Sequence, residues 1–160
     1  MIKVAVEIDI RRPAADVFTY LEDAENNPRW IPNMRSCRWI TPPPIRMGSK
    51  YEQLSEFLGR KIQTNFEVTD HQPGRAITIA SRQGSSFPIT VTRIVDPRGA
   101  GSCHVTEVTE GDTSGFYAIA TPLLRPMVVR NIRRDYRNLK RILEAGGPEG
   151  CTPNEKSARL

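Results

Sequence analysis

The sequence lacks the features that mark several large classes of protein. Its three cysteines are widely spaced, at Cys37, Cys103 and Cys151, which argues against a disulfide framework and favours a reducing compartment. No apolar run approaches the roughly 18 residues of a membrane-spanning helix. The first residues also lack the basic, apolar and small-residue order of a signal peptide. We therefore expect a soluble, cytoplasmic protein.

Motifs for metal binding, cofactor binding and nucleophilic catalysis are missing as well. The two histidines, His71 and His104, form no pair at helical spacing, and there is no CxxC motif. The sequence therefore predicts no metal site. It has no Walker loop, GxSxG or GxGxxG motif, so we expect no cofactor and no familiar catalytic machinery.

Charge is concentrated in one segment of the chain. The net charge is +5, and residues 122–145 hold seven basic and two acidic side chains, whereas the rest of the chain holds 16 of each. A solvated outer face of a helix is the first interpretation, because charge runs usually have that role. Weak contact with an anionic membrane surface is the second. Nucleic-acid binding is not expected, since the segment lacks interleaved aromatic residues and any known module.

Alternation of apolar and polar residues predicts strands over much of the chain. Residues 2–10 alternate with a period of two, which is typical of a half-buried antiparallel strand. Further strands are expected between turn signals rich in Gly, Pro, Asp and Asn. These strands are predicted over 35–41, 49–57, 60–70, 75–82, 87–95 and 102–110.

One hairpin can be checked from the sequence itself. If Leu58 and Gly59 form a two-residue turn, Phe57 pairs with Arg60. Apolar residues of both neighbouring strands then fall on one face of the sheet. This agreement favours a meander of antiparallel strands.

Helices are predicted around this block of strands. Apolar spacing indicates a short helix over 13–22, and residues 23–34 read as one irregular helical turn or loop. A long amphipathic helix is expected to end near Ala145 and to begin at Thr121-Pro122 or, if Pro126 marks the start, later. Its apolar stripe comprises Leu124, Val128, Ile132, Tyr136, Leu139 and Leu143. Residues 1–145 would form one domain, and 146–160 a flexible C-terminal tail.

The order of these elements and the local sequence resemble those of a known superfamily. The matching stretches are IDIRRPAADVFTYLEDAENNPRWIPNM, MGSKYEQLSEFLGRKIQTNFEVTDHQPGRAI and TPLLRPMVVRNIRRDYRNLKRIL. They resemble the START-like (SRPBCC) superfamily, and within it the bacterial polyketide cyclase/dehydrase branch. The resemblance implies an α+β helix-grip fold. In that fold a curved seven-stranded antiparallel sheet surrounds a long C-terminal helix, and short helices lie between strands 1 and 2.

A cavity between the sheet and the long helix is the expected site. Polar residues interrupt its apolar inner face, as small-molecule sites require, although Gln53 and Ser55 could equally lie near strand ends in water. In the last strand either Val105 and Glu107 or Val108 face inward. The resemblance adds Trp30 near the pocket entrance, with a packing role as the alternative. The candidate ligand-binding residues are Trp30, Tyr51, Gln53, Ser55, Phe57, Thr64, Phe66, Ile79, Glu107, Leu124, Val128 and Ile132.

Two functions remain open at this point. The first is binding of a small hydrophobic molecule, such as a lipid, quinone or polyketide-like compound. The second, implied by the resemblance, is a polyketide cyclase or aromatase that folds a bound poly-β-ketone so that a carbon nucleophile meets a carbonyl. Tyr51 and Arg125 are the candidates for an assisting side chain, Arg125 only because its helical phase falls on the apolar stripe.

Overall fold

The computed structural model describes residues 2–57, 59–81, 88–111 and 116–146, with only the backbone described for Phe57 and for residues 116–121. The predicted flexible tail therefore lies outside the described residues from residue 147 onward. The side chain of Phe57, a predicted site residue, lies outside them too.

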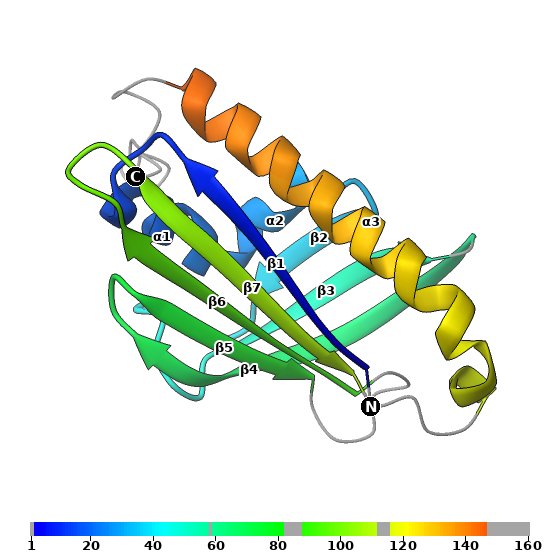
Figure 1. The fold of residues 1–160 in the computed structure, drawn as a ribbon. Coiled ribbons are helices and arrows are strands. Elements are labelled where there is room, and N and C mark those ends of the chain that lie inside the picture. The colour runs from blue at the N-terminus through cyan, green and yellow to red at the C-terminus, as the bar shows by residue number, and fades with distance from the viewer. Residues whose placement is uncertain (1, 58, 82–87, 112–115, 147–160) are drawn as a thin grey trace.

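Seven strands form a single antiparallel sheet, as the sequence predicted (Figure 1). Its spatial order is β1-β7-β6-β5-β4-β3-β2, so β1 and β2 are the edge strands. No strand end differs from its predicted position by more than two residues. The strands are β1 (Ile2–Ile10), β2 (Met34–Trp39), β3 (Lys50–Phe57), β4 (Arg60–Gln72), β5 (Ala76–Ser81), β6 (Ile89–Pro97) and β7 (Cys103–Gly111).

The register of the strands places the apolar side chains on one concave face. Phe57 pairs with Arg60, as predicted, and Gly59 has a positive φ of 75°, whereas Leu58 lies outside the described residues. Across the sheet, Tyr51 is paired with Phe66, and Val68 with Ile79. The β2–β3 and β4–β5 pairings each contain a register shift, which bends and twists a sheet locally.

Three short helical segments connect the two edge strands. They are α1 (Ala14–Glu22), the 3₁₀ turn η1 (Ala24–Asn26) and α2 (Asn27–Trp30). The prediction of a single irregular turn over 23–34 was therefore too simple. Pro28 lies in the first turn of α2, where its missing N–H removes no intrahelical hydrogen bond. α1 packs on β6 and β7, whereas η1 and α2 pack on β2.

The long helix α3 (Phe116–Ala145) runs diagonally along the sheet and packs on β1 and α2 (Figure 1). It begins earlier than predicted and contains both Pro122 and Pro126. Both prolines are exposed, and each lacks the N–H that would bond the carbonyl four residues earlier in the helix. The predicted stripe is confirmed, since Tyr136, Leu139 and Leu143 are buried, while Leu124, Val128 and Ile132 are partly buried.

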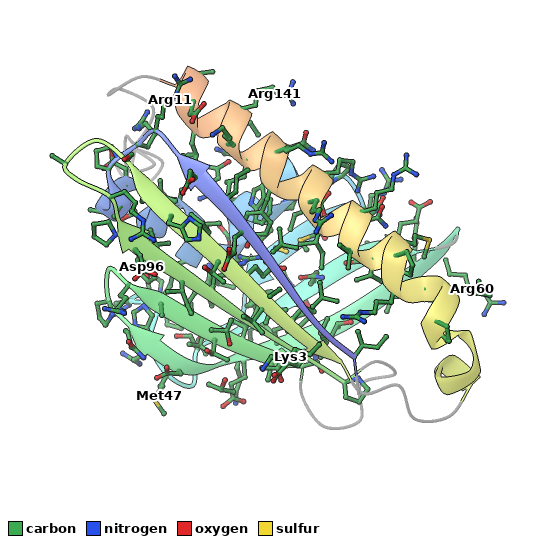
Figure 2. The ribbon with its side chains drawn as sticks, in the orientation of Figure 1. Lys3, Arg11, Met47, Arg60, Asp96 and Arg141 are labelled. Carbon is green, nitrogen blue, oxygen red and sulfur yellow. The ribbon has the colours of Figure 1, made fainter. Side chains whose placement is uncertain are left out.

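Side chains fill much of the space between α3 and the sheet, whereas charged residues such as Arg11, Arg60 and Arg141 point away from it (Figure 2). The outer face of α3 carries the predicted basic residues: Arg130, Arg133, Arg137 and Arg141 are exposed, and Arg134 and Lys140 are partly so. The charge concentration seen in the sequence is therefore a helix surface.

Candidate functional site

A cavity of about 230 Å³ lies between the sheet and the middle of α3 and is partly open to solvent. The side chains that line it come from α2, from six of the seven strands and from α3. Eight of the twelve predicted site residues line it. They are Trp30, Tyr51, Gln53, Phe66, Ile79, Glu107, Val128 and Ile132.

Three other predicted residues do not line the cavity. Ser55 accepts a hydrogen bond from Gln53 Nε2 at 2.8 Å, and Thr64 is the cross-strand neighbour of Gln53. Leu124 is partly buried on α3, one turn before Val128. All three lie outside the cavity, because the inner faces of the strands and the apolar stripe of α3 extend further than the space that helix and sheet enclose.

The orientation of β7 is settled by burial. Val105 is fully buried, and Glu107 on the same face is only 7% exposed. Val108 is partly exposed on the opposite face. The carboxylate of Glu107 therefore faces the interior, which is the first of the two alternatives that the sequence left open.

Arg93 is the main site residue that the sequence reasoning missed. It lies on β6 opposite Glu107 and is only 7% exposed. The alternation of Ile89, Val91 and Val95 puts Arg93 on the same inner face, so the period of two contained the signal.

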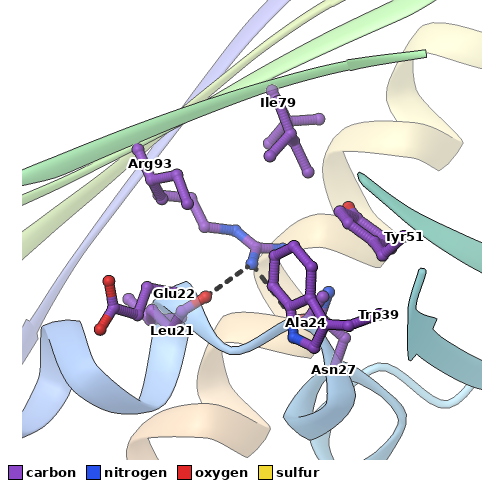
Figure 3. A pocket seen from close by; sticks show the side chains of 10 residues that line it. Leu21, Glu22, Ala24, Asn27, Trp39, Tyr51, Ile79 and Arg93 are labelled. Carbon is purple, nitrogen blue, oxygen red and sulfur yellow. Dashed lines mark hydrogen bonds between the residues drawn. The ribbon is translucent and has the colours of Figure 1, made fainter. Parts of the chain in front are cut away.

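Arg93 is held by partners from three elements, α1, α2 and β7, and Figure 3 shows its hydrogen bonds to Leu21 and Asn27. Its Nε donates to Glu107 Oε2 at 3.3 Å. Its Nη1 donates to Asn27 Oδ1 at 3.2 Å and to the Leu21 carbonyl at 3.3 Å. The guanidinium also lies 5.1 Å from the ring centre of Trp30, within the range of a cation–π contact. These contacts fix the position of the guanidinium charge in the wall of the cavity.

Glu107 is shared between this arginine and α3. The hydroxyl of Tyr136 donates to Glu107 Oε2, and Thr109 Oγ1 donates to Oε1 at 3.1 Å. Burial and the neighbouring Glu107 raise the pKa of Tyr136 well above its ordinary value, so the phenol stays protonated. Burial alone would lower the pKa of Arg93, but Tyr136, Glu107 and Tyr51 raise it above the ordinary value. Arg93 therefore keeps its positive charge at neutral pH, in contact with the carboxyl group of Glu107.

Aromatic rings form the wall beside this network. Tyr51 stacks on Phe66 with ring centres 5.2 Å apart, and Trp39 meets Tyr51 edge-on at 5.2 Å. Trp30 meets Tyr136 edge-on at 5.0 Å. Trp30 is 2% exposed and lines the cavity. Such rings supply a large apolar contact area to any occupant.

Several buried polar atoms beside the cavity have no hydrogen-bond partner among the described residues. They include the Tyr51 hydroxyl and Trp30 Nε1. Burial raises the pKa of Tyr51 above its ordinary value, so this hydroxyl remains a donor at neutral pH. Buried polar groups in native proteins are nearly always paired, and each exception requires an explanation.

Two neighbouring recesses are weaker candidates. A niche of about 10 Å³ between η1 and the sheet shares Asn27, Tyr51 and Arg93 with the cavity (Figure 3), but it could hold no more than about one water molecule. A surface recess of about 460 Å³ lies outside the sheet–helix interior, between Asp23 and the loop around Pro43. There Asp23 Oδ1 already accepts from Trp39 Nε1 at 2.9 Å.

The other residues considered for chemistry lie away from the cavity or are inert. His71 contacts Glu22 at 3.0 Å and His104 contacts Asp9 at 2.6 Å, and neither lines the cavity. Arg125, a candidate assisting side chain, is exposed on α3, so that candidate is not supported. Burial raises the pKa of Cys37 to about 12, which keeps its thiol protonated. Within the described ranges, no group of His, Cys, Asp and Glu is arranged to hold a metal ion.

Comparison with known proteins agrees with this architecture. Residues 1–144 match the family described as polyketide cyclase / dehydrase and lipid transport. The chain belongs to this family. A search of curated proteins finds no match.

Aromatase/cyclases and a START superfamily protein are among the similar solved structures. The Zhui aromatase/cyclase from a Streptomyces species has a TM-score of 0.77 at 13% identity, covering 95% of this chain and 99% of that one. A START superfamily protein from Mycobacterium smegmatis has a TM-score of 0.64 at 18% identity, covering 89% and 94%. The di-domain aromatase/cyclase StfQ of the steffimycin pathway has a TM-score of 0.68 at 16% identity, covering 89% of this chain and 51% of that one.

These likenesses show the helix-grip, START-like fold, which the sequence had predicted. Family membership supports a role in ligand binding or in polyketide cyclisation. None of the described helices is long and apolar enough to span a membrane.

Proposed function

We propose that the protein binds a small, mostly apolar molecule in the cavity between the sheet and α3. The observation that carries this proposal is the cavity itself, about 230 Å³ with aromatic and aliphatic walls and a polar floor. Protein interiors are close-packed and rarely contain voids much larger than a water molecule. An engineered cavity of about 150 Å³ is known to bind benzene, so this space suits a compound of one or two rings.

Dye binding tests the proposal directly. The neutral two-ring dye 1-aminonaphthalene should bind the wild-type protein with a blue shift of its fluorescence, and other naphthalene derivatives should displace it. Val128→Trp should abolish dye binding, because Val128 lines the cavity. Arg137→Trp, which places the same ring on the exposed face of α3, is the matched control and should bind like the wild type. Absence of dye binding by the wild type, or equal binding by both variants, would reject the cavity as a binding site.

A cyclase activity is the alternative, and one observation favours it. Tyr51 lines the cavity and its phenol stays protonated, so it is the candidate donor to the carbonyl of a bound poly-β-ketone once a substrate displaces the side chains that cover its hydroxyl. Arg93 is less suited to this role, because Glu107, Asn27 and the Leu21 carbonyl already accept from three of its five N–H donors and Glu107 pairs with its charge. Mass spectrometry of products formed from a synthetic poly-β-ketone thioester tests it. Cyclised products that disappear with Tyr51→Phe would establish the enzyme.

The start of α3 favours contact with an anionic membrane surface as a further property. Leu123 is 84% exposed, and it shares this helix with the exposed basic residues Arg130, Arg133 and Arg137. In the part of the chain that the structure describes, the ion pairs of α3 involve Arg134 and Lys140 but none of these three arginines. Exposed apolar and basic side chains on one helix match the interface of an anionic bilayer.

Vesicle sedimentation tests this contact. The protein should sediment with vesicles that contain phosphatidylglycerol and much less with pure phosphatidylcholine vesicles. Leu123→Ser combined with Arg133→Glu should remove the difference. Equal sedimentation with both kinds of vesicle, or no effect of the double substitution, would reject membrane contact through α3 while leaving ligand binding untouched.

A further inference from the structure

The surface recess between Asp23 and the loop around Pro43 is separate from the cavity between the sheet and α3. The two share none of their lining residues. The volume of the recess is about 460 Å³, within the range of about 300–1,000 Å³ that is usual for small-molecule sites. The junction of α1 and η1 forms one side of it, and the end of β2 with the loop that follows forms the other. It is therefore large enough to hold a ligand of its own.

Apolar side chains make up most of the wall of this recess. They are Trp39, Ile40, Pro42, Pro43 and Ile45. The chain after β2 is held in place by hydrogen bonds, since the N–H groups of Ile40 and Thr41 donate to the Lys50 carbonyl at 2.8 and 3.2 Å. The Lys50 N–H in turn donates to Thr41 Oγ1 at 2.8 Å. An occupant would therefore meet a wall that is already formed and would not have to order this part of the loop, a cost that otherwise reduces affinity.

Two carboxylates line the recess, and each has one oxygen atom without a partner. Asp23 Oδ1 accepts from Trp39 Nε1 at 2.9 Å and from the Glu25 N–H at 3.1 Å, and Glu25 Oε1 accepts from the Trp39 N–H at 3.3 Å. Among the described residues, nothing donates to Asp23 Oδ2 or Glu25 Oε2, and neither carboxylate has an ion-pair partner. No lysine or arginine lines the recess.

Both free oxygens are within reach of an occupant. Glu25 is exposed and Asp23 is partly exposed, and Asp23 Oδ2 is not among the buried atoms that lack a partner. The two negative charges therefore face an apolar, solvent-accessible space in which the protein supplies no cation. The group that complements them is positively charged, and the surface beside them favours an apolar body attached to that charge.

We propose that this recess binds a small organic cation, in which an ammonium or guanidinium group is carried on an apolar ring or chain. The cationic group pairs with Asp23 and Glu25, while the apolar part lies against Trp39 and the prolines. A neutral compound of the same shape would leave both carboxylates unpaired, and an anion would be repelled by them. Binding here is independent of the ligand proposed for the cavity and goes beyond that function.

Three compounds of similar shape test the charge preference. They are 2-phenylethylamine, which is a cation at pH 7, the neutral 2-phenylethanol and the anion 3-phenylpropionate. The chain has two tryptophans, of which Trp39 lines the recess and Trp30 does not. In NMR titrations of ¹⁵N-labelled protein, the amine should shift the indole N–H signal of Trp39, because this group donates to Asp23.

The affinities from these titrations decide the outcome. The amine should bind about fivefold more tightly than the alcohol, the upper end of what a solvent-exposed ion pair contributes, and the propionate should bind most weakly. High salt should reduce the preference for the amine, because it screens exposed charges. Equal affinities for amine and alcohol, tightest binding of the propionate, or no shift of the Trp39 signal with the amine would overturn the proposal.

Substitutions identify the site. Asp23→Asn combined with Glu25→Gln removes both charges but keeps oxygen atoms that accept hydrogen bonds, and it should lower the affinity for the amine to that for the alcohol. Glu7→Gln combined with Asp96→Asn removes two charges that do not line the recess and should leave the preference intact. Val128→Trp, which fills the cavity, should not change binding of the amine. If the first variant keeps the full preference, or Val128→Trp abolishes amine binding, the recess is not the site of the cation.

Discussion

The two ends of the space between the sheet and α3 differ sharply in packing. At one end Ile10, Val95, Val105 and Leu139 are completely buried. Towards the other end Ile89, Val91 and Thr109 of the same sheet line the cavity together with Val128 and Ile132. The packed end has a second helical layer, because α1 lies on β6 and β7. The space between the curved sheet and α3 is therefore close-packed where α1 fills it, and a cavity remains beyond α1.

The ion pair of Arg93 and Glu107 lies between these two ends. In the register of β6 and β7 the pair precedes the apolar Val95–Val105 pair and follows the Val91–Thr109 pair of the cavity wall. Its side chains are about as buried as the core, yet they face the cavity. Four predictions test this division, beginning with the largest expected effect.

Removing one member of the buried ion pair should be the most damaging change. Glu107→Ala leaves the Arg93 charge buried without its carboxylate, which costs about 3–5 kcal/mol of unfolding free energy. The double variant Arg93→Met with Glu107→Leu removes both charges and should recover most of that loss. Urea denaturation measures both values. A single variant as stable as the wild type would mean that the pair is not buried in the folded protein.

Removing a large side chain from the packed end should have the second largest effect. Leu139 is fully buried on α3, and Leu139→Ala should lower the free energy of unfolding by about 2–5 kcal/mol through lost contacts and a new cavity. Urea denaturation with a constant slope is the appropriate measurement. A loss below about 1 kcal/mol would contradict the assignment of this end as a close-packed core.

Enlarging a side chain at the hollow end should cost much less. Val128→Trp adds volume where about 230 Å³ is already open, so we expect a loss below about 1 kcal/mol, against about 1–3 kcal/mol for overpacking a filled core. Leu139→Trp at the packed end is the matched comparison in thermal melts. Equal destabilisation by the two substitutions would remove the distinction between the ends.

The smallest effect is expected on the outer face of α3. Arg137 is exposed and donates to the Arg133 carbonyl of its own helix. Arg137→Ala should change the free energy of unfolding by no more than about 0.5 kcal/mol. A larger loss in urea denaturation would show that this face takes part in packing and would weaken the case for a free basic surface.

The alternation of apolar and polar residues predicted many of the residues that line the cavity, and the errors of that prediction have physical causes. Alternation placed Tyr51, Gln53 and Phe66 on the inner face correctly. Ser55 and Thr64 share that face but lie past the end of the cavity, because a one-dimensional pattern does not say where the helix stops covering the sheet. Arg93 was overlooked because an inward arginine needs partners, and Glu107, Asn27 and Leu21 come from distant parts of the chain.

The sequence by itself determined the seven strands, the register of the β3–β4 hairpin and the buried stripe of α3, since these depend on local periodicity, turn residues and the apolar face that each element must bury. It also placed the basic residues on the opposite side of that helix. Only the tertiary structure decided that Glu107 rather than Val108 faces inward and that Arg93 neutralises it. Only the structure decided, too, which end of the interior is hollow. Those outcomes depend on how the rigid helix crosses the curved sheet, and on charges that meet only when strands and helices far apart in the sequence are brought together.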